Sequence, residues 1–241
     1  MTFLFAGTRG EIAARTRRHR RHTMTMVSTR EGRVLIDRGT DWLNRPWRPI
    51  PAAVLITHAH DDHVGGLKSG APCPVYATAE TWRTIRRWDV RQRVALPLRR
   101  PFRLAGLTVE AFPVLHSVRA PAVGYRLEDG QVTIFYVPDV AKIPAMHEAL
   151  RGVNVYIGDG ATIARPLIRL RDQGPIGHAS IRQQLEWCRH EGVPRAIFTH
   201  CGSAIVAHQE SEALATIRAL GRAHDVNVAV AHDGWRCTMT G

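Results

Sequence analysis

The chain has 241 residues, of which 44% are hydrophobic, and a formal net charge of +12. This length can bury the core of one large domain, and no apolar run reaches the roughly 18–20 residues that cross a bilayer. The first residues lack the basic region of a signal peptide. Four widely spaced cysteines argue against a disulfide framework or a cysteine zinc site. We therefore expect a cytoplasmic protein with reduced thiols.

The positive charge is concentrated in two arginine-rich stretches, residues 15–22 and 83–103. A basic field of this size attracts phosphates, nucleic acid or other anions by long-range steering. Alternatively, these arginines only form a solvated surface on a protein that is rich in arginine throughout. Charge alone therefore does not select a substrate.

In chain order, the apolar pattern of the first half predicts mainly short strands. These strands are expected over residues 2–6, 23–27, 33–37, 52–57 and 75–77. A Pro- and Trp-rich loop covers residues 42–51. A short helix is expected over 63–67, and Thr78 is placed to cap a helix that runs to about Trp88.

The second half alternates strands with longer helices. The strands are expected over residues 102–104, 107–112, 123–127, 132–137, 153–157, 195–199 and, as the last one, 226–231. Ser180 caps a helix to about His190, and residues 211–220 form another that Gly221 ends. Hairpin runs followed by helices suit two sheets packed face to face with helices outside, rather than a doubly wound parallel sheet. Without a repeat or a clear linker, one domain over residues 1–241 is expected.

The most specific feature is the segment His58-Ala59-His60-Asp61-Asp62-His63, directly after the apolar run 52–56. Neutral imidazole nitrogens and carboxylate oxygens at this density suit Zn²⁺ or a similar borderline divalent metal. A solvated His-rich loop could arise by chance in a chain with 13 histidines. Further candidate ligands downstream argue against that interpretation.

Three later residues, His116, Asp139 and His200, also follow predicted strands. Each of them alone could be an ordinary strand-end residue that is hydrogen-bonded to a neighbouring loop. With the four ligands of the first loop they make a set of seven, His58, His60, Asp62, His63, His116, Asp139 and His200. Seven ligands suffice for two metal ions that share one bridging carboxylate.

The motif H-x-H-x-D-H at residues 58–63, together with the later candidate ligands, resembles that of the metallo-β-lactamase fold superfamily. The resemblance covers nearly the whole chain. The resemblance implies an α+β fold, a four-layer αββα sandwich with the site at one edge of the sheets. It assigns His58, His60 and His116 to one metal ion, Asp62, His63 and His200 to the other, and Asp139 to a bridge. Zn²⁺ is the expected ion, with Mn²⁺ or Fe²⁺ as alternatives. Two such ions lower the pKa of a bound water from 15.7 to about 7 and leave a positive charge that favours an anionic substrate.

A second stretch, Gly177-His178-Ala179-Ser180 with a helix, a strand and Thr199-His200 after it, resembles the phosphodiesterase branch of this superfamily. That branch contains ribonuclease Z and the cyclic-phosphate phosphodiesterase of phosphonate breakdown. The resemblance implies that His178 contacts the scissile phosphate and protonates the leaving alkoxide, which is worth about 10²–10⁴-fold in rate. Asp159 lies where ribonuclease Z has a H-E-A-T motif, and the resemblance implies that it orients His178. We also expect Asp62 to be a catalytic residue. Alternatively, His178 only begins a helix.

The chain departs from both of these relatives. The interval of 23 residues between His116 and Asp139 holds a single predicted hairpin, so the tRNA-clamping arm of ribonuclease Z does not fit there. The chain also lacks the N-terminal cysteines that bind the structural zinc of the cyclic-phosphate enzyme. The arginine-rich run 17–22 occupies that region instead.

Five further residues have weaker claims on the site. The arginines Arg165, Arg169 and Arg171 could bind phosphate oxygens in a fork geometry or belong to a solvated lid. Asp233, in His232-Asp233-Gly234, is expected to hydrogen-bond a ligand imidazole and fix its tautomer. Asp37 has a similar claim, since it lies on a strand that enters the site region.

These features favour a dinuclear metal-dependent hydrolase, a phosphodiesterase that cleaves a small or cyclic phosphodiester through metal-bound hydroxide with His178 as general acid. A lactone or thioester hydrolase, or a tRNA- or RNA-processing nuclease, is the alternative on the same metal site. Outside hydrolases, the alternatives are a mono-iron thiol or persulfide oxygenase and a non-catalytic nucleic-acid-binding module. The expected partner is a small anionic phosphodiester rather than nucleic acid or a membrane. The sequence does not decide whether the chain forms a homodimer.

Overall fold

Two seven-stranded sheets form the centre of the fold in a computed structural model that describes residues 1–172, 174–207 and 210–239. The first sheet has the order β16 (Trp235–Thr238), β1 (Thr2–Gly7), β2 (Met24–Ser28), β3 (Arg33–Ile36), β4 (Ala53–Leu55), β5 (Val75–Ala77) and β6 (Arg93–Ala95). Strands β16 to β3 are antiparallel neighbours, whereas β3 to β6 run parallel.

The second sheet has the same mixed construction. Its order is β15 (Asn227–Val230), β14 (Arg195–Thr199), β11 (Val155–Asp159), β10 (Thr133–Tyr136), β9 (Ala122–Glu128), β8 (Leu107–Val114) and β7 (Phe102–Leu104). Strands β10, β11, β14 and β15 run parallel, and β7 to β10 form an antiparallel meander. A separate two-stranded ribbon consists of β12 (Leu167–Arg171) and β13 (Gly174–His178).

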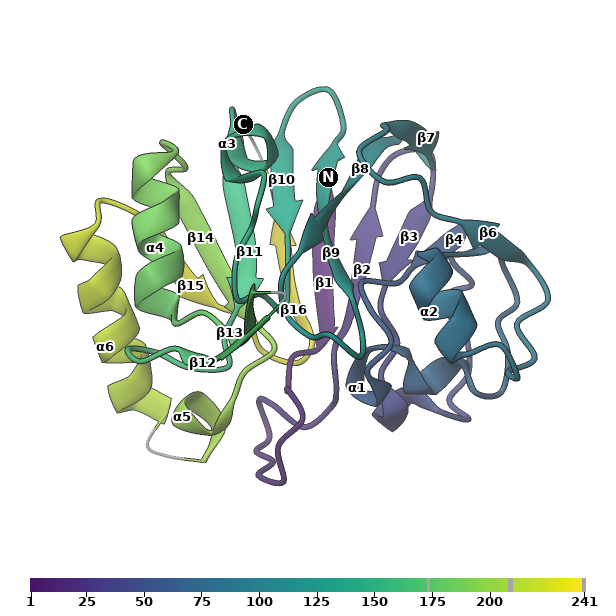
Figure 1. The fold of residues 1–241 in the computed structure, drawn as a ribbon, viewed down its shortest axis with the longest axis horizontal. Helices are drawn as coiled ribbons and strands as arrows, with labels where there is room; N and C mark the ends of the chain where they lie inside the picture. The colour runs from purple at the N-terminus through teal and green to yellow at the C-terminus, as the bar shows by residue number, and fades with distance from the viewer. Residues whose placement is uncertain (173, 208–209, 240–241) are drawn as a thin grey trace.

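The helices lie on the two outer faces of this pair of sheets (Figure 1). On the side of the second sheet are α3 (Met146–Leu150), α4 (Ile181–His190), α5 (Ser203–Val206) and α6 (Glu210–Ala223). On the side of the first sheet are α1 (Asp61–Val64), α2 (Ala79–Thr84) and the 3₁₀ turns η1 (Thr40–Trp42) and η2 (Gly65–Leu67). None of the helices in the described ranges is long and apolar enough to cross a bilayer.

Three apolar clusters separate the four layers. One lies between the sheets and includes Phe3, Phe5 and Tyr125, because alternate residues of each strand point to the same face. Another packs α4 and α6 on the second sheet, and the third packs α1 and α2 on the first. The predicted αββα sandwich is therefore confirmed.

Capping residues locate two helices as predicted. The Thr78 side chain accepts a hydrogen bond from the Thr81 backbone N–H at the start of α2, and Ser180 does the same for Gln183 in α4. This contact satisfies one of the unpaired donors at a helix N-terminus. Helix α2 ends at Thr84 instead of about Trp88.

Several predicted boundaries were wrong, and some elements were not predicted. The segment 226–231 is not the last strand, because β16 follows and pairs with β1 at the edge of the first sheet. Gly221 does not end its helix, which runs on to Ala223. A Cβ atom there would lie 2.4 Å from Val228 Cγ1, so this glycine serves close packing of α6 on β15. The unpredicted elements are β6, β12, β13, β16, α3, α5 and the 3₁₀ turn η1.

Candidate metal centre

Loops at the carboxyl ends of several strands converge at one edge of the two sheets, the lower edge in Figure 1. The loop after β4 carries His58, His60, Asp62 and His63, while His116 follows β8, Asp139 follows β10 and His200 follows β14. Strands β8, β10 and β14 run in the same direction, because two antiparallel pairings separate β8 from β10. Helix α1 begins directly after His60 and places Asp62 and His63 in its single turn.

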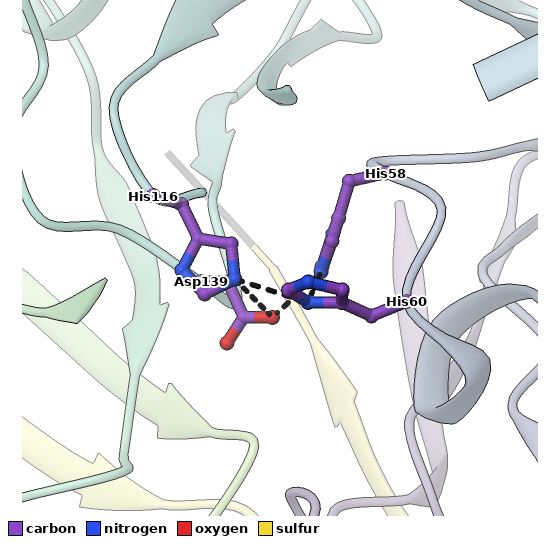
Figure 2. A group of neighbouring side chains, drawn as sticks. All are labelled: His58, His60, His116 and Asp139. Atoms are coloured by element: carbon purple, nitrogen blue, oxygen red, sulfur yellow. Dashed lines mark hydrogen bonds and ion pairs between the residues drawn. The ribbon is translucent and has the colours of Figure 1, made fainter. Parts of the chain in front are cut away.

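The first cluster consists of His58, His60, His116 and Asp139 (Figure 2). His60 Nδ1 lies 3.0 Å from His58 Nε2 and 3.2 Å from His116 Nε2. Asp139 Oδ2 approaches His58 Nε2 to 3.1 Å. Ligands about 2.0–2.1 Å from a tetrahedral Zn²⁺ would lie roughly 3.3 Å from each other, so these spacings fit one ion.

The second cluster lies beside the first and shares Asp139 with it. Asp62 Oδ2 is 3.0 Å from His200 Nε2 and 3.4 Å from His63 Nε2. Asp139 also contacts both of these imidazoles, and lies 2.8 Å from His63 Nε2 through Oδ2 and 2.8 Å from His200 Nδ1 through Oδ1. One carboxylate thus contacts both clusters, as a bridging ligand must.

Outer hydrogen bonds orient three of the imidazoles. The Nδ1–H of His63 donates to Asp37 Oδ2 at 2.8 Å, and that of His116 donates to the Gly177 carbonyl at 3.0 Å. Thr57 Oγ1 donates to Asp37 and accepts from His58 Nδ1 at 3.0 Å. With Nδ1 protonated, each ring presents the lone pair of Nε2 to the cluster. The predicted role of Asp37 beside a candidate ligand therefore agrees with its contact to His63.

Three of the atoms that face the clusters are buried and lack ordinary partners. Within the described residues, His63 Nε2, Asp139 Oδ1 and His200 Nδ1 have no hydrogen bond of acceptable geometry. Buried polar atoms rarely lack a hydrogen-bond partner. In addition, imidazole lone pairs that face each other repel unless a cation lies between them. The donor set, nitrogen from imidazole and oxygen from carboxylate, is the set that Zn²⁺ and similar ions prefer. The residues therefore fit divalent metal ions.

Electrostatics divide the histidines into two groups. Burial and the neighbouring His116 lower the pKa of His60 to about 4, and burial together with His63 lowers the pKa of His58. These rings are neutral, as metal ligands must be. Burial also opposes a charge on His63, but Asp62 and Asp139 outweigh it and raise the pKa of His63.

A third group of side chains extends the centre toward His178. The Nδ1–H of His178 donates to Asp159 Oδ2 at 2.8 Å, and the same nitrogen is 3.5 Å from Asp139 Oδ1. Asp159, at the end of β11, is fully buried and also accepts from the backbone N–H of Val140 and Ala161. Burial opposes a charge on His178, but Asp159 outweighs it and raises the pKa of His178.

A cavity of about 740 Å³ opens onto the three groups. Candidate ligands and His178 form one wall. The rest of the lining is apolar or small at Ile12, Ala161, Leu167, Gly202 and Ala204, and also includes the polar residues Glu11, Asp61, Thr162 and Ser203. Among the described residues that line this cavity there is no lysine or arginine, although the whole chain carries a net charge of +12.

Two of the weaker predictions differ from the structure. Asp233 accepts hydrogen bonds from Thr8 and from the backbone N–H groups of Arg20 and Arg21, so it holds the N-terminal loop instead of a ligand imidazole. Of the three arginines, Arg169 lines a neighbouring cavity of about 580 Å³ that His60 and His116 share. Arg165 and Arg171 are exposed and line neither of these two cavities.

Sequence reasoning missed residues that support or line the site. The Gln184 side chain accepts from the Asp159 N–H and donates to the Asp159 carbonyl, which fixes the end of β11. Gln184 is buried in α4, and a glutamine within an otherwise apolar helix face was the available signal. Ile12 and Leu167 lie in segments without a motif, so their sequence offered no signal.

The comparisons with known proteins agree with this geometry. A family model described as "Beta-lactamase superfamily domain" matches residues 32–201. An octanoyltransferase of Porphyromonas gingivalis is 28% identical over 219 residues, which cover 80% of this chain and 42% of that protein. The chain therefore spans less than half of that relative.

Two further matches have names that refer to phosphate chemistry. A ribonuclease Z of Mycolicibacterium paratuberculosis is 25% identical over 212 residues, which cover 71% of this chain and 75% of that protein. The crystal structure of a diphosphatase from the PhnP family superposes with a TM-score of 0.72 at 20% identity and covers 99% of this chain and 97% of that one. At this identity, the structural match speaks for the fold alone.

The membership of this superfamily that H-x-H-x-D-H predicts is thereby confirmed. The match to the family covers most of the chain, the two sheets have the expected four-layer arrangement, and the clusters at their edge fit divalent ions. Together these findings indicate a candidate centre for divalent metal ions on this fold. The chain belongs to the beta-lactamase superfamily domain family and has the metallo-β-lactamase fold.

Proposed function

We propose that this protein is a phosphodiesterase that cleaves a small phosphodiester, with His178 as the acid that protonates the leaving oxygen. The observation that carries the proposal is the His178–Asp159 pair beside the candidate metal ligands. Asp159 holds the Nδ1–H of His178, so the opposite nitrogen, Nε2, is available to a substrate in the cavity that His178 lines.

In this proposal each residue has a distinct role. His58, His60 and His116 would hold one ion, Asp62, His63 and His200 the other, and Asp139 would bridge them. When bound, such ions supply Lewis acidity and a water of lowered pKa. Asp159 keeps the His178 ring in one tautomer and stabilises its protonated form. His178 then transfers its proton to the departing oxygen, and Asp159 offsets the charge on the ring before that step.

The cavity favours a small substrate over RNA. A polyanionic chain needs basic side chains along its path, and the residues described around the cavity include none. The interval between His116 and Asp139 is occupied by β9 and β10, which form a single hairpin. Ile12, Leu167 and Ala204 suit an apolar group on one side of the phosphorus.

The test compares leaving groups in the metal-loaded enzyme. General-acid help matters for a poor leaving group such as an alkoxide and little for p-nitrophenolate. We expect His178→Ala to lower kcat on an alkyl phosphodiester by about 10²–10⁴-fold and to change turnover of bis(p-nitrophenyl) phosphate far less. Both rates are measured with the metal content of each sample.

His147→Ala is the matched control. His147 also pairs with a carboxylate, Glu191, at 2.9 Å, but lies on α3 with an exposed side chain. We expect no change in either rate. An equal loss on both substrates in His178→Ala, or full metal occupancy without any phosphodiester turnover, would contradict the proposal.

A second candidate is a hydrolase of acyl esters or thioesters. The apolar wall around Leu167 and Ile12 favours it, because an acyl chain would bury its surface there. The similarity to an octanoyltransferase is consistent with such a substrate. Turnover of lactones or acyl thioesters that survives His178→Ala, without phosphodiester turnover, would select this candidate, whereas one iron per chain would indicate an oxygenase.

A further inference from the structure

A second cavity, of about 450 Å³, lies in the N-terminal loop and is lined almost entirely by arginines. Its walls are Arg15, Arg17, Arg20, Arg21 and Arg45, together with Thr16 and Asp41. It shares no lining residue with the cavity at the metal centre. The loop that carries four of these arginines projects from the lower edge of the molecule in Figure 1.

The charge in this arginine cavity is not balanced by the protein. Its one carboxylate among the described lining residues, Asp41, already pairs with Arg9 at 2.7 Å. Arg9 is buried, with 1% of its surface exposed, so Asp41 already has a buried cationic partner. Arg15 also reaches Asp41, at 3.3 Å. Within the part of the chain that the structure describes, the guanidinium groups of Arg17 and Arg20 have no acidic partner.

Some exposed arginines elsewhere in the chain have acidic partners. Arg18 lies 2.6 Å from Glu210, and Arg83 lies 2.9 Å from Glu80. What sets Arg17 and Arg20 apart is that they lack such a partner and line one cavity together with three further arginines. Burial and the neighbouring Arg45 and Arg20 lower the pKa of Arg21, which shows that these cations repel each other.

The loop is held in this unfavourable arrangement by fixed contacts. Asp233 Oδ2 accepts from the backbone N–H groups of Arg20 and Arg21, both at 3.0 Å. The Arg21 guanidinium lies 4.7 Å from the ring centroid of Trp42. Arg45 Nε donates to the Asp41 carbonyl at 3.0 Å. These contacts fix the backbone of the loop and the side chains of Arg21 and Arg45, which reduces the entropy that would be lost on binding.

We propose that the arginine cavity is a binding site for a ligand with a multiply charged phosphate group, separate from the metal centre. Guanidinium groups bind phosphate oxygens in bidentate pairs, and several of them around one cavity match a pyrophosphate better than a singly charged ion. The volume falls within the range of small-ligand sites. A small polyphosphate is favoured over a nucleic acid strand, because the arginines surround one cavity instead of following a line.

The test measures binding of imidodiphosphate, which resists hydrolysis, to the metal-loaded full chain by titration calorimetry. The variant is Arg17→Gln/Arg20→Gln, which removes two side chains without an acidic partner. The control is Arg83→Gln/Arg86→Gln, which makes the same charge change at exposed positions near α2. Metal content and melting temperature are recorded for all three proteins.

We expect the wild type and the control to bind one more equivalent of imidodiphosphate than the variant, or to bind it at least about 10-fold more tightly. Any binding of imidodiphosphate at the metal centre is expected equally in all three proteins, so it does not affect the comparison between them. The same affinity and stoichiometry in the variant would overturn the proposal. Binding of a single-stranded oligonucleotide but not of imidodiphosphate, with a steep salt dependence that the variant loses, would overturn the assignment to a small ligand. The inference does not depend on the proposed phosphodiesterase activity.

Discussion

At the scale of single residues, Asp37 combines three hydrogen bonds that bear on the metal centre. Its Oδ1 accepts from the Thr57 N–H at 2.8 Å, and its Oδ2 accepts from Thr57 Oγ1 and from His63 Nδ1, both at 2.8 Å. The side chain is fully buried. Asn in its place brings an NH₂ group toward one of these donors, so either the Thr57 contact or the His63 contact is lost.

We therefore predict that Asp37→Asn weakens metal binding by about 10–100-fold, because His63 loses the partner that fixes its tautomer. Metal affinity is measured by competition with a chromogenic chelator. Asp225→Asn is the control, since Asp225 has nearly the same left-handed backbone, φ 54° against 58°, at an exposed position. Unchanged affinity in Asp37→Asn would show that His63 needs no such partner.

The sequence could predict the residues that carry a motif, but not those that depend on tertiary structure. H-x-H-x-D-H and the strand-end positions of His116, Asp139 and His200 indicated residues that the structure brings together. The prediction for Asp233 was wrong, because sequence does not show that the backbone of the loop with Arg20 would donate to this carboxylate. Ile12 and Leu167 line the cavity only because distant segments meet there.

At the scale of secondary structure, the β12–β13 ribbon joins the candidate ligands to His178. The Gly177 N–H donates to the His116 carbonyl at 2.7 Å, while the Gly177 carbonyl accepts from His116 Nδ1. Gly177 has φ +112°, and a Cβ atom there would lie 1.9 Å from the Leu167 carbonyl oxygen. The ribbon can pair in this register only with glycine at this position.

We predict that Gly177→Ala displaces the end of β13 and lowers kcat by at least about 10²-fold, since a shift near 1 Å can cost that much. The melting temperature should change little, because the ribbon lies outside both main sheets. Gly130→Ala is the control, as Gly130 has φ +83° and nothing within 4 Å of a Cβ atom. Comparable kcat losses in both variants would assign the effect to backbone strain rather than to the ribbon.

The missed strands share a physical cause. β6, β12 and β16 are short strands with exposed residues, and each exists because it pairs with a neighbour. Local apolar periodicity does not show such a pairing. The long central strands β8 and β9 and the capped helix α4 were predictable, because alternation and a capping serine are local features.

At the scale of the whole molecule, the candidate metal centre joins the two sheets. His58, His60, Asp62 and His63 follow a strand of the first sheet, whereas His116, Asp139 and His200 follow strands of the second. Four carboxylates, Asp37, Asp62, Asp139 and Asp159, are buried within this region. Ions bound there would offset this negative charge and hold both sheets at one edge. An unfolded chain has no such preformed set of ligands.

We predict that a chelator lowers the melting temperature of the metal-loaded protein by about 5–10 °C. Binding to the native state alone stabilises it by about 2.7 kcal/mol at a free ligand concentration of 100 times Kd, and each kcal/mol shifts the melting temperature of a chain this size by about 2–4 °C. Calorimetry with and without the chelator measures the difference. His63→Ala should lose most of the shift, while His178→Ala, which removes no proposed ligand, should keep it. A chelator-induced shift of the same size in His63→Ala as in the wild type would exclude His63 from the metal centre.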